Sequence, residues 1–289
     1  MAGAALGPAC ARSPVNSILL SLCIPTYNRL PYLRELLPGV VAELARLNEA
    51  ELNVELLISD NASTDGTEAY LRDVSCRGLS VYRNARNIGA DRNFLACVER
   101  ASGTYIWLFG DDEVLERGGV ARTLAQLRRL RPALAILRDG QQQGASASGE
   151  TLYADYGACV RAEMGTSFDF ALTHTLITAN VFRKDAFDLK EAEARLRTNY
   201  AHMYGLLCGL RRGGAVAVLA GAFRTRPQRA QFDRWPTALC VKQAWYLWQL
   251  AGWFGVPRLR RGALRLALNL PLELLSCCAH RVFPKIGRT

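Results

Sequence analysis

The sequence lacks any run of about 18 uncharged apolar residues, so no helix that crosses a bilayer is expected. Its first 16 residues lack a basic cluster followed by a long apolar core, so a secretory signal peptide is not expected either. Nine cysteines are present, but none form a Cys-x-x-Cys pair. Their odd number and scattered spacing argue against a disulfide framework or a structural zinc site. These absences favour a protein of the reducing cytoplasm.

Charge is distributed very unevenly along the chain. Half of the 289 residues are hydrophobic and 21% are charged, which is enough to bury one large core, with or without an appendage. The chain has 36 basic residues (Lys and Arg) and 26 acidic residues (Asp and Glu). Residues 205–289 hold 14 basic and 2 acidic residues, whereas residues 1–204 hold 22 basic and 24 acidic residues. The net charge of +10 therefore comes from the last 85 residues, which indicates an anionic surface as a partner.

Apolar runs alternate with amphipathic segments through about residue 140. Strands are predicted at 17–24, 54–59, 79–84, 104–110 and 133–139. Helices are predicted from the apolar positions between Leu33 and Leu47, at 66–74, up to about Ala101, and through Leu124, Leu127 and Leu130. This alternation predicts crossover connections and a Rossmann-like, mostly parallel α/β sheet. Beyond residue 150 the pattern weakens: 191–213 is expected to be helical, 214–226 to return as a strand, and the chain from Pro236 to be helical.

A polar cluster follows each of the first four predicted strands. In order, these clusters are PTYNR (25–29), SDNASTDGT (59–67), RNARNIGADRN (83–93) and GDDE (110–113). Turns alone favour such residues, because their side chains hydrogen-bond the local backbone. However, ligands of parallel α/β sheets bind in the crevice outside the carboxyl ends of the strands. Four clusters at one sheet edge therefore predict a binding site.

The adjacent carboxylates of Asp111 and Asp112 lie at the rim of the predicted core. Oxygen ligands at such a position suit a hard divalent cation that can hold a diphosphate. The alternative is a polar turn whose acids favour the N-terminus of the next helix.

In this order and spacing, the four motifs resemble the nucleotide-sugar domain of family 2 glycosyltransferases, which have the GT-A fold. The resemblance covers about residues 17–140. The GDDE motif is similar to that of the abequosyltransferase-like branch, whose members act in bacterial surface polysaccharide assembly. The first position of the family's Asp-x-Asp motif holds Phe109 here, and the adjacent aspartate pair remains.

The resemblance implies a role for each matching loop. Asp60 is expected to bind the nucleobase, and the loop with Pro25 and Thr26 to line the nucleoside. Asp111 and Asp112 are expected to hold ribose, metal and diphosphate, so a divalent ion, Mn or Mg, is the implied cofactor. The same loops contribute the other expected donor-binding residues, which are Tyr27, Arg29, Asn61 and Ser63.

The chemistry of the Asp60 loop fits this role. A fixed carboxylate can accept a hydrogen bond from a pyrimidine N–H, while Asn61, Ser63 and Thr64 organise the loop. Asp65 and Thr67 are expected to cap the following helix. The alternative is a loop that serves only as turn and cap.

Two further residues are candidates. Arg92 is a candidate cation for the donor phosphates, because a guanidinium fork matches phosphate oxygens; a surface ion pair is the alternative. Family members carry an acidic base about eleven residues before a helix-ending glycine, and counting back from Gly213 gives His202. A histidine there can take a proton from an acceptor hydroxyl or ligate the metal, whereas a partly buried structural histidine is the alternative.

The expected protein is a glycosyltransferase that moves a hexosyl or deoxyhexosyl group from a nucleoside diphosphate donor to a hydroxyl of a glycan or lipid-linked glycan. Residues 15–140 would form the nucleotide-sugar core, 141–235 the acceptor side of the same domain, and 236–289 a helical C-terminal segment. A nucleotidyltransferase is one alternative, although it would carry a glycine-rich loop where PTYNRLP has no glycine. A non-catalytic sugar-nucleotide-binding module is the other.

The C-terminal segment combines tryptophans with arginines, which favour the headgroup level and anionic lipid. Its apolar runs are interrupted at Lys242, Pro257 and Arg265. We therefore expect helices that lie on the inner face of the cytoplasmic membrane without crossing it. The alternative is a helical cap on the globular domain or a dimer contact. Nucleic acid is not an expected partner, because the basic residues accompany large apolar faces.

Overall fold

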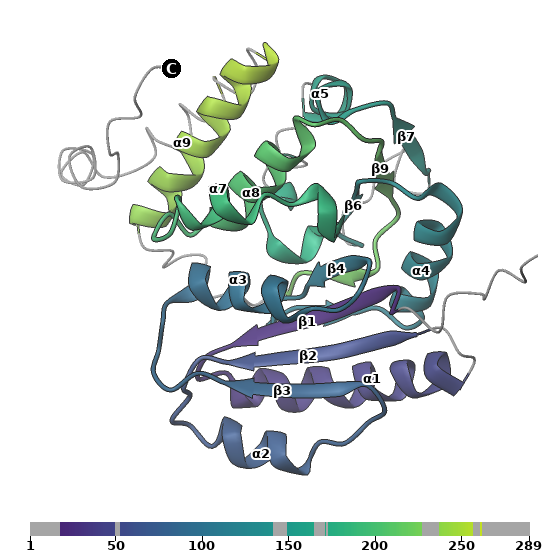
Figure 1. Ribbon diagram of the computed structural model, residues 1–289, viewed down its shortest axis with the longest axis vertical. Helices are drawn as coiled ribbons and strands as arrows, with labels where there is room; N and C mark the ends of the chain where they lie inside the picture. The colour runs from purple at the N-terminus through teal and green to yellow at the C-terminus, as the bar shows by residue number, and fades with distance from the viewer. Residues whose placement is uncertain are drawn as a thin grey trace, which may run out of the picture.

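The computed structural model describes residues 18–49, 53–140, 149–164, 171, 173–226, 237–256 and 261, and only the backbone within 237–245. Its first half alternates strands with helices, as predicted (Figure 1). The strands are β1 (Leu20–Thr26), β2 (Val54–Asp60), β3 (Leu79–Arg83) and β4 (Tyr105–Leu108). The helices are α1 (Leu30–Glu49), α2 (Thr67–Asp73), α3 (Ala90–Arg100) and α4 (Gly119–Leu130).

The first four strands are parallel, and their carboxyl ends meet at one edge of the sheet. β1 lies between β2 and β4, and β2 also pairs with β3, so the arrowheads of β1, β2 and β3 point to the same side in Figure 1. The register aligns Thr26 with Asp60, and Asp60 with Arg83. All seven residues of β1 are buried, which explains its continuous apolar sequence. The loops that follow β1 and β2 therefore begin side by side.

The second half adds short strands and helices. The strands are β5 (Val114–Leu115), β6 (Leu134–Leu137), β7 (Thr151–Tyr153), β8 (Asn180–Arg183), β9 (Val216–Leu219) and β10 (Phe223–Arg224). The helices and helical turns are α5 (Tyr156–Cys159), η1 (Val160–Met164), η2 (Ile177–Ala179), η3 (Lys184–Ala186), α7 (Leu189–Glu193), α8 (Ala201–Leu210) and α9 (Thr237–Phe254). The described strands form one eight-stranded sheet, β3-β2-β1-β4-β8-β6-β9-β7, and a two-stranded sheet, β10-β5.

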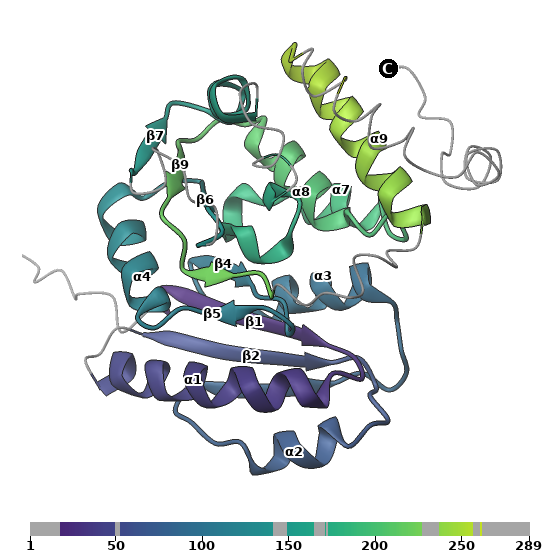
Figure 2. The same ribbon diagram turned by 180° about the vertical axis from the view of Figure 1, so that it is seen from behind.

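The large sheet is mixed but mostly parallel. The pairs β1–β2, β1–β4, β2–β3 and β6–β9 are parallel. Strand β8 is antiparallel to both β4 and β6, and β7 is antiparallel to β9. The sheet separates two hydrophobic cores. Leu22 and Ile24 of β1 face a core shared with α1 and α4, whereas Cys23 faces a core shared with α3, α8 and α9. Figure 2 shows α1 on the near side of the sheet, running along β2, on the first of these faces. The mostly parallel α/β prediction is confirmed.

Two element predictions from the second half were wrong in detail. The single helix expected at 191–213 is divided into α7 and α8, because Arg197 and Asn199 have φ angles of 71° and 64°, which a right-handed helix cannot contain. The single strand expected at 214–226 is divided into β9 and β10. Between them the backbone at Gly221 passes so close to the Arg138 carbonyl oxygen that a Cβ would clash, and the chain moves to the smaller sheet.

Helix α9 packs across the region of α8, as both views show (Figures 1 and 2). Its residues Tyr246, Leu247, Leu250 and Ala251 are at most 2% exposed and belong to the same core as α8. The predicted helical C-terminal extension is confirmed over α9, Thr237–Phe254. Within the described part of the chain, no helix combines the length and apolar character needed to span a bilayer. The first 17 residues, Pro257 and Arg265, on which predictions were also made, lie outside the described residues.

Candidate active site

The loop after β1 is joined to the acidic loop after β4. The hydroxyl of Thr26 donates a hydrogen bond of 2.7 Å to Oδ2 of Asp111, and both residues are buried. The neighbouring strands β1 and β4 bring these two residues together although they are 85 positions apart in sequence. Asp112 follows as a half-buried residue, and its backbone carbonyl accepts a 3.1 Å hydrogen bond from Nε of Arg226.

Next to this contact is a cavity of about 290 Å³. Both halves of the chain line it, and its main lining residues are Pro25, Arg29, Phe94, Asp111, Asp112, Thr175, Thr178, Tyr200 and His202. The cavity therefore unites two predicted donor-loop residues, the aspartate pair and the predicted base. Thr178 was not predicted; its Oγ1 accepts a 2.9 Å hydrogen bond from the backbone N–H of Gly110 and so orders the acidic loop.

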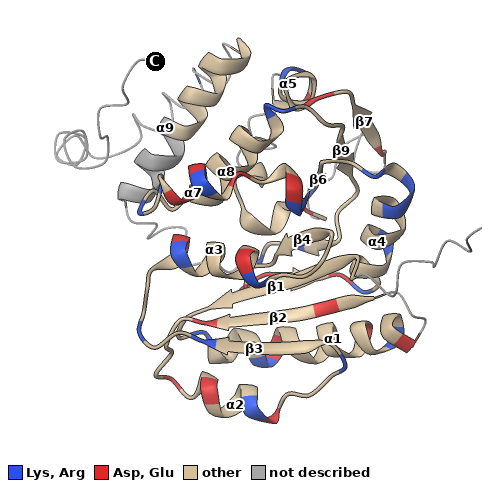
Figure 3. Ribbon diagram, in the orientation of Figure 1, with Lys and Arg blue, Asp and Glu red and all other residues tan. Residues whose placement is uncertain are grey.

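Asp60 is held by its own loop and by the next strand. It is 1% exposed; Oδ1 accepts a 3.0 Å bond from the Ser63 backbone N–H, and Oδ2 forms an ion pair with Arg83. Arg83 also donates to the Ser63 carbonyl at 3.0 Å. No role was predicted for Arg83 from the sequence. The parallel register of β2 and β3 places it directly beside Asp60. Figure 3 shows acidic and basic segments at these strand ends.

Asn61 and Ser63 connect Asp60 to two other polar loops. The Asn61 side chain donates to Asn87 at 2.8 Å and accepts from the Ile88 N–H at 3.0 Å, both in the loop before α3. Ser63 Oγ accepts from the backbone N–H of Asn28 at 2.8 Å. These bonds confirm that the two residues organise the loop.

The predicted helix cap is present in a modified form. Asp65 accepts hydrogen bonds from the backbone N–H of Thr67 at 3.2 Å and from that of Leu30 at 3.0 Å. The residue in the N-cap position of α2 is Gly66, which forms no side-chain cap. Asp65 therefore fixes the starts of both α1 and α2.

The predicted Arg92 lies at a neighbouring cavity of about 620 Å³ rather than beside the aspartate pair. Its Nη1 is 2.8 Å from Oε1 of Glu193, and both side chains are more than 40% exposed. This cavity shares Ala90 and Asn199 with the first one, so the two are adjacent. The surface ion pair that was the alternative for Arg92 is therefore present. Tyr27, the first residue after β1, is 42% exposed.

His202 is 3% exposed and lies at the start of α8. Its Nε2 is 3.2 Å from the carbonyl oxygen of Thr175, so Nε2 carries the proton and Nδ1 carries the lone pair. Nδ1 has no hydrogen-bond partner among the described residues. Burial lowers the pKa of His202 to about 4, despite the opposing effect of the Thr175 carbonyl. The imidazole is therefore neutral near pH 7.

The position of His202 depends on α3. Asp91, in the first turn of α3, accepts hydrogen bonds from the backbone N–H groups of Asn199 at 2.9 Å and Ala201 at 3.3 Å. The start of α3 and the segment that leads into α8 are thereby fixed to each other. The second described histidine, His174, is also buried but does not line the cavity. Its Nε2 is 2.6 Å from the Tyr156 hydroxyl, and burial lowers its pKa to about 3.

No group of three or more histidine, cysteine, aspartate or glutamate residues among the described residues has the geometry of a metal site. A magnesium-type ion does not require one, because it commonly uses one or two carboxylates and takes its remaining ligands from water and substrate phosphates. Asp111, fixed by Thr26, and Asp112, on the cavity, have the donor chemistry of such a substrate-assisted site. The residues present therefore fit a divalent ion.

The chain matches the family described as "Glycosyl transferase family 2" over residues 21–187, more than half of its length, and it belongs to that family. Members of the family commonly use a divalent metal. The match favours the glycosyltransferase interpretation over the nucleotidyltransferase alternative.

Among characterised and uncharacterised relatives, the chain is similar to abequosyltransferase RfbV of Salmonella typhimurium, with 46% identity over 108 residues, or 36% of this chain and 31% of the relative. It is also similar to the uncharacterized protein Rv1520 of Mycobacterium tuberculosis, with 34% identity over 97 residues, or 32% and 27% of the two chains. The match thus spans less than a third of either relative.

The fold is similar to that of S. aureus TarS. The complex of TarS 1–349 with UDP-GlcNAc has a TM-score of 0.56 and 13% identity, over 80% of this chain and 67% of that one. The complex with UDP has a TM-score of 0.53 and 14% identity, over 80% and 66%. At this identity the likeness concerns the fold alone, and it confirms the GT-A prediction.

Proposed function

We propose that this protein transfers a hexosyl or deoxyhexosyl group from a nucleoside diphosphate donor to a hydroxyl acceptor in surface polysaccharide synthesis. The observation that carries the proposal is one cavity lined by the Asp111–Asp112 pair and by His202. Carboxylates that can hold a divalent ion for the diphosphate, and a neutral proton acceptor for the acceptor hydroxyl, are groups that such a transfer uses. The names of an abequosyltransferase and of a UDP-GlcNAc-bound protein among the similar proteins support it.

The donor would extend from Asp60 to the aspartate pair. A carboxylate has about four lone-pair sites, so Asp60 can accept from a nucleobase N–H in addition to its bonds from Ser63 and Arg83. Pro25, Thr26 and Tyr27 would line the nucleoside. The donor phosphates would meet Arg29, which lines the cavity, and Arg92 would approach them from the adjacent cavity if its bond to Glu193 is exchanged.

A divalent ion, Mn or Mg, held by Asp112 and Asp111 would neutralise charge on the departing diphosphate. The bond between the anomeric carbon and the phosphate oxygen breaks, and its electron pair leaves with the diphosphate. The acceptor oxygen forms the new bond to that carbon, and its proton moves to Nδ1 of His202. His202 can accept this proton because its Nδ1 has no hydrogen-bond partner among the described residues and its Nε2 proton is already engaged with Thr175.

The direct test is a thermal-shift and turnover screen of purified full-length protein with UDP-, CDP-, GDP- and dTDP-sugars, with and without Mn²⁺. A true donor should raise the melting temperature according to its occupancy, and turnover should release the free nucleoside diphosphate. Donor binding without release or transfer under any condition would instead favour a non-catalytic sugar-nucleotide-binding module. No shift with any donor would contradict both functions.

Residues 141–235 are the proposed acceptor side, and the proposal is supported by Thr175, Thr178, Tyr200 and His202, which line the cavity together with the strand-end loops. A lipid-linked glycan is the proposed acceptor. The outer face of α9 is the proposed contact with an anionic membrane on its cytoplasmic side. On this face Trp248 and Trp253 are 40% and 45% exposed, and residues 246–254 carry no charge (Figure 3). The guanidinium of Arg211 lies 5.5 Å from the ring centre of Trp253, so a positive charge accompanies the exposed aromatic rings, as at a membrane surface.

A double substitution, Trp248→Ser with Trp253→Ser, tests this contact better than truncation, because truncation before α9 would also remove its buried residues. Co-sedimentation with anionic liposomes at low salt should fall strongly in the double variant. Leu152→Ser removes an apolar side chain of similar exposure, 51%, from β7, and should leave binding unchanged. Equal binding by the wild type and the double variant would contradict the proposed membrane face.

A further inference from the structure

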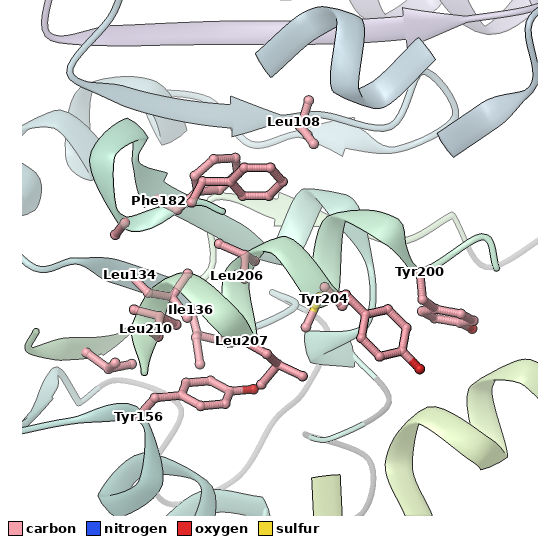
Figure 4. Packing of buried hydrophobic residues seen from close by; sticks show 14 of the residues in the cluster. Leu108, Leu134, Ile136, Tyr156, Phe182, Tyr200, Tyr204, Leu206, Leu207 and Leu210 are labelled. Atoms are coloured by element: carbon pink, nitrogen blue, oxygen red, sulfur yellow. The ribbon is translucent and has the colours of Figure 1, made fainter. Parts of the chain in front are cut away.

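A stack of aromatic rings extends from α9 to His202. The ring of Tyr246 is stacked on that of Tyr200, with centres 5.7 Å apart and planes 7° apart. The Tyr200 ring is in turn stacked on the His202 imidazole at 6.2 Å and 26°. Figure 4 shows Tyr200 and Tyr204 extending from the α8 region toward α9, the yellow-green helix.

Further rings contact the two ends of the stack from the side. Phe94 of α3 meets the His202 imidazole edge to face at 5.8 Å, and Tyr204 meets the Tyr246 ring in the same manner at 5.8 Å. Tyr204 is also bonded to α9, because its hydroxyl donates to Gln249 at 2.7 Å. Tyr246, Tyr200 and His202 are 1%, 4% and 3% exposed. The stack is therefore enclosed within the protein.

Among the described residues, one hydrogen bond restrains the His202 ring, the 3.2 Å contact from Nε2 to Thr175. The torsion that turns an imidazole about its Cβ–Cγ bond has a broad energy minimum, so one bond of this length defines the ring plane weakly. Stacked rings add about 0.5–1.5 kcal/mol per pair beyond area burial and favour one plane. The stack on Tyr200 and the edge contact of Phe94 are thus the ring contacts that restrain the plane of this imidazole.

Tyr200 and His202 line the cavity, whereas Tyr246 does not. We propose that Tyr246 is a positioning residue that acts through Tyr200 to hold His202 with Nε2 on Thr175 and with Nδ1 unbonded. The inference deepens the proposed function and depends on it only for the consequence in turnover. It also makes α9, which follows the family match at 21–187, a part of the active site.

Imidazole NMR tests the positioning without an activity assay. The chain has three histidines, so the signals of ¹⁵N-histidine-labelled protein are few, and His202→Gln identifies those of His202. Tyr246→Leu removes the ring and should shift or broaden the His202 signals, whereas Tyr246→Phe keeps the ring and should retain them. If Tyr246→Leu does not fold by circular dichroism, Tyr246→Met carries the same expectation.

Phe254→Leu is the matched control, because it makes the same kind of change on the same helix. Phe254 contacts the ring of Tyr156 at 5.5 Å and is not part of the stack. This variant should lower the melting temperature and leave the His202 signals unchanged. Unchanged His202 signals in folded Tyr246→Leu, or an equal change in Phe254→Leu, would overturn the proposal.

In transfer assays, Tyr246→Leu should lower kcat about tenfold, the effect of about 1.4 kcal/mol, and change the KM for the donor less than twofold. Tyr246→Phe should restore kcat. An unchanged kcat in Tyr246→Leu would overturn the functional role of Tyr246. A wild-type protein without transfer activity would contradict the proposed function, and the NMR comparison would still decide whether Tyr246 positions His202.

Discussion

The hydroxyl of Thr26 donates to Oδ2 of Asp111 across 2.7 Å, and this buried contact joins the ends of β1 and β4. It fixes one oxygen of a carboxylate that lines the cavity. Thr26→Val keeps the shape of the side chain and removes the donor. We expect a loss of about 1–3 kcal/mol in the free energy of unfolding and a weaker dependence of activity on Mn²⁺. Thr104→Val, at an exposed threonine directly before β4 and so at the opposite edge of the sheet, should change neither quantity.

Asp60 is expected to set the affinity for the nucleobase. Asp60→Ala would also leave Arg83 without its buried partner, so Asp60→Asn is the sharper variant, since its amide oxygen can still accept from the Ser63 N–H. Donor affinity measured by calorimetry should fall at least about tenfold, because a charged acceptor hydrogen bond is worth roughly 1.5–3 kcal/mol. Unchanged donor affinity in folded Asp60→Asn would remove Asp60 from the donor site.

Asp112 is expected to be the main metal-contacting acid. Asp112→Asn should cost several kcal/mol of transition-state stabilisation, at least about a hundredfold in kcat/KM. The control is Glu116→Gln, a carboxylate nearby in sequence that pairs with Arg122 and does not line the cavity. Full activity of the wild type in excess chelator would contradict the metal role.

His202→Gln should depress kcat far more than donor affinity, since the proposed role of His202 concerns the acceptor proton. His174→Gln is the matched control, because His174 is the other buried described histidine and lies outside the cavity lining. Its kcat should remain near that of the wild type after correction for the folded fraction. Equal kcat in the wild type and His202→Gln would return His202 to a structural role.

The two buried histidines also predict how stability depends on pH. Burial lowers their pKa values to about 4 for His202 and about 3 for His174, from an ordinary value of 6.5. Below about pH 6.5 the unfolded chain takes up protons that the folded protein does not, so the free energy of unfolding should fall as the pH decreases from 6.5 toward 4. Urea unfolding at pH 7, 6 and 5 measures this slope. His202→Gln should reduce the slope, and an unchanged slope would contradict the burial of a neutral imidazole.

The strand-end loops could be predicted from sequence because apolar runs that end in polar clusters mark the carboxyl edge of a parallel sheet. Asp111 and Asp112, Pro25 and Asp60 were found in this way, and the structure places them at that edge. The register of short parallel strands is not encoded as clearly, so the pairing of Asp60 with Arg83 was missed.

Contacts between distant segments left no signal in the sequence. Arg226 pairs with Glu35 across 191 positions and donates to the Asp112 carbonyl, yet nothing in the local pattern marks either residue. The tryptophans and arginines of the C-terminal segment predicted an interfacial helix, but the pattern does not tell which ring of α9 meets Tyr200 and which meets solvent. Only the packing of α9 separates buried Tyr246 from exposed Trp248.

The central claim is that the cavity between the aspartate pair and His202 transfers a sugar. The most direct measurement is the release of nucleoside diphosphate from the donor that gives the largest thermal shift, with a hydroxyl acceptor and Mn²⁺ present, by the wild type, Asp112→Asn and His202→Gln. We predict acceptor-dependent release by the wild type and a loss of at least about tenfold in each variant, with both variants folded. Release by the wild type that neither substitution reduces would contradict the claim.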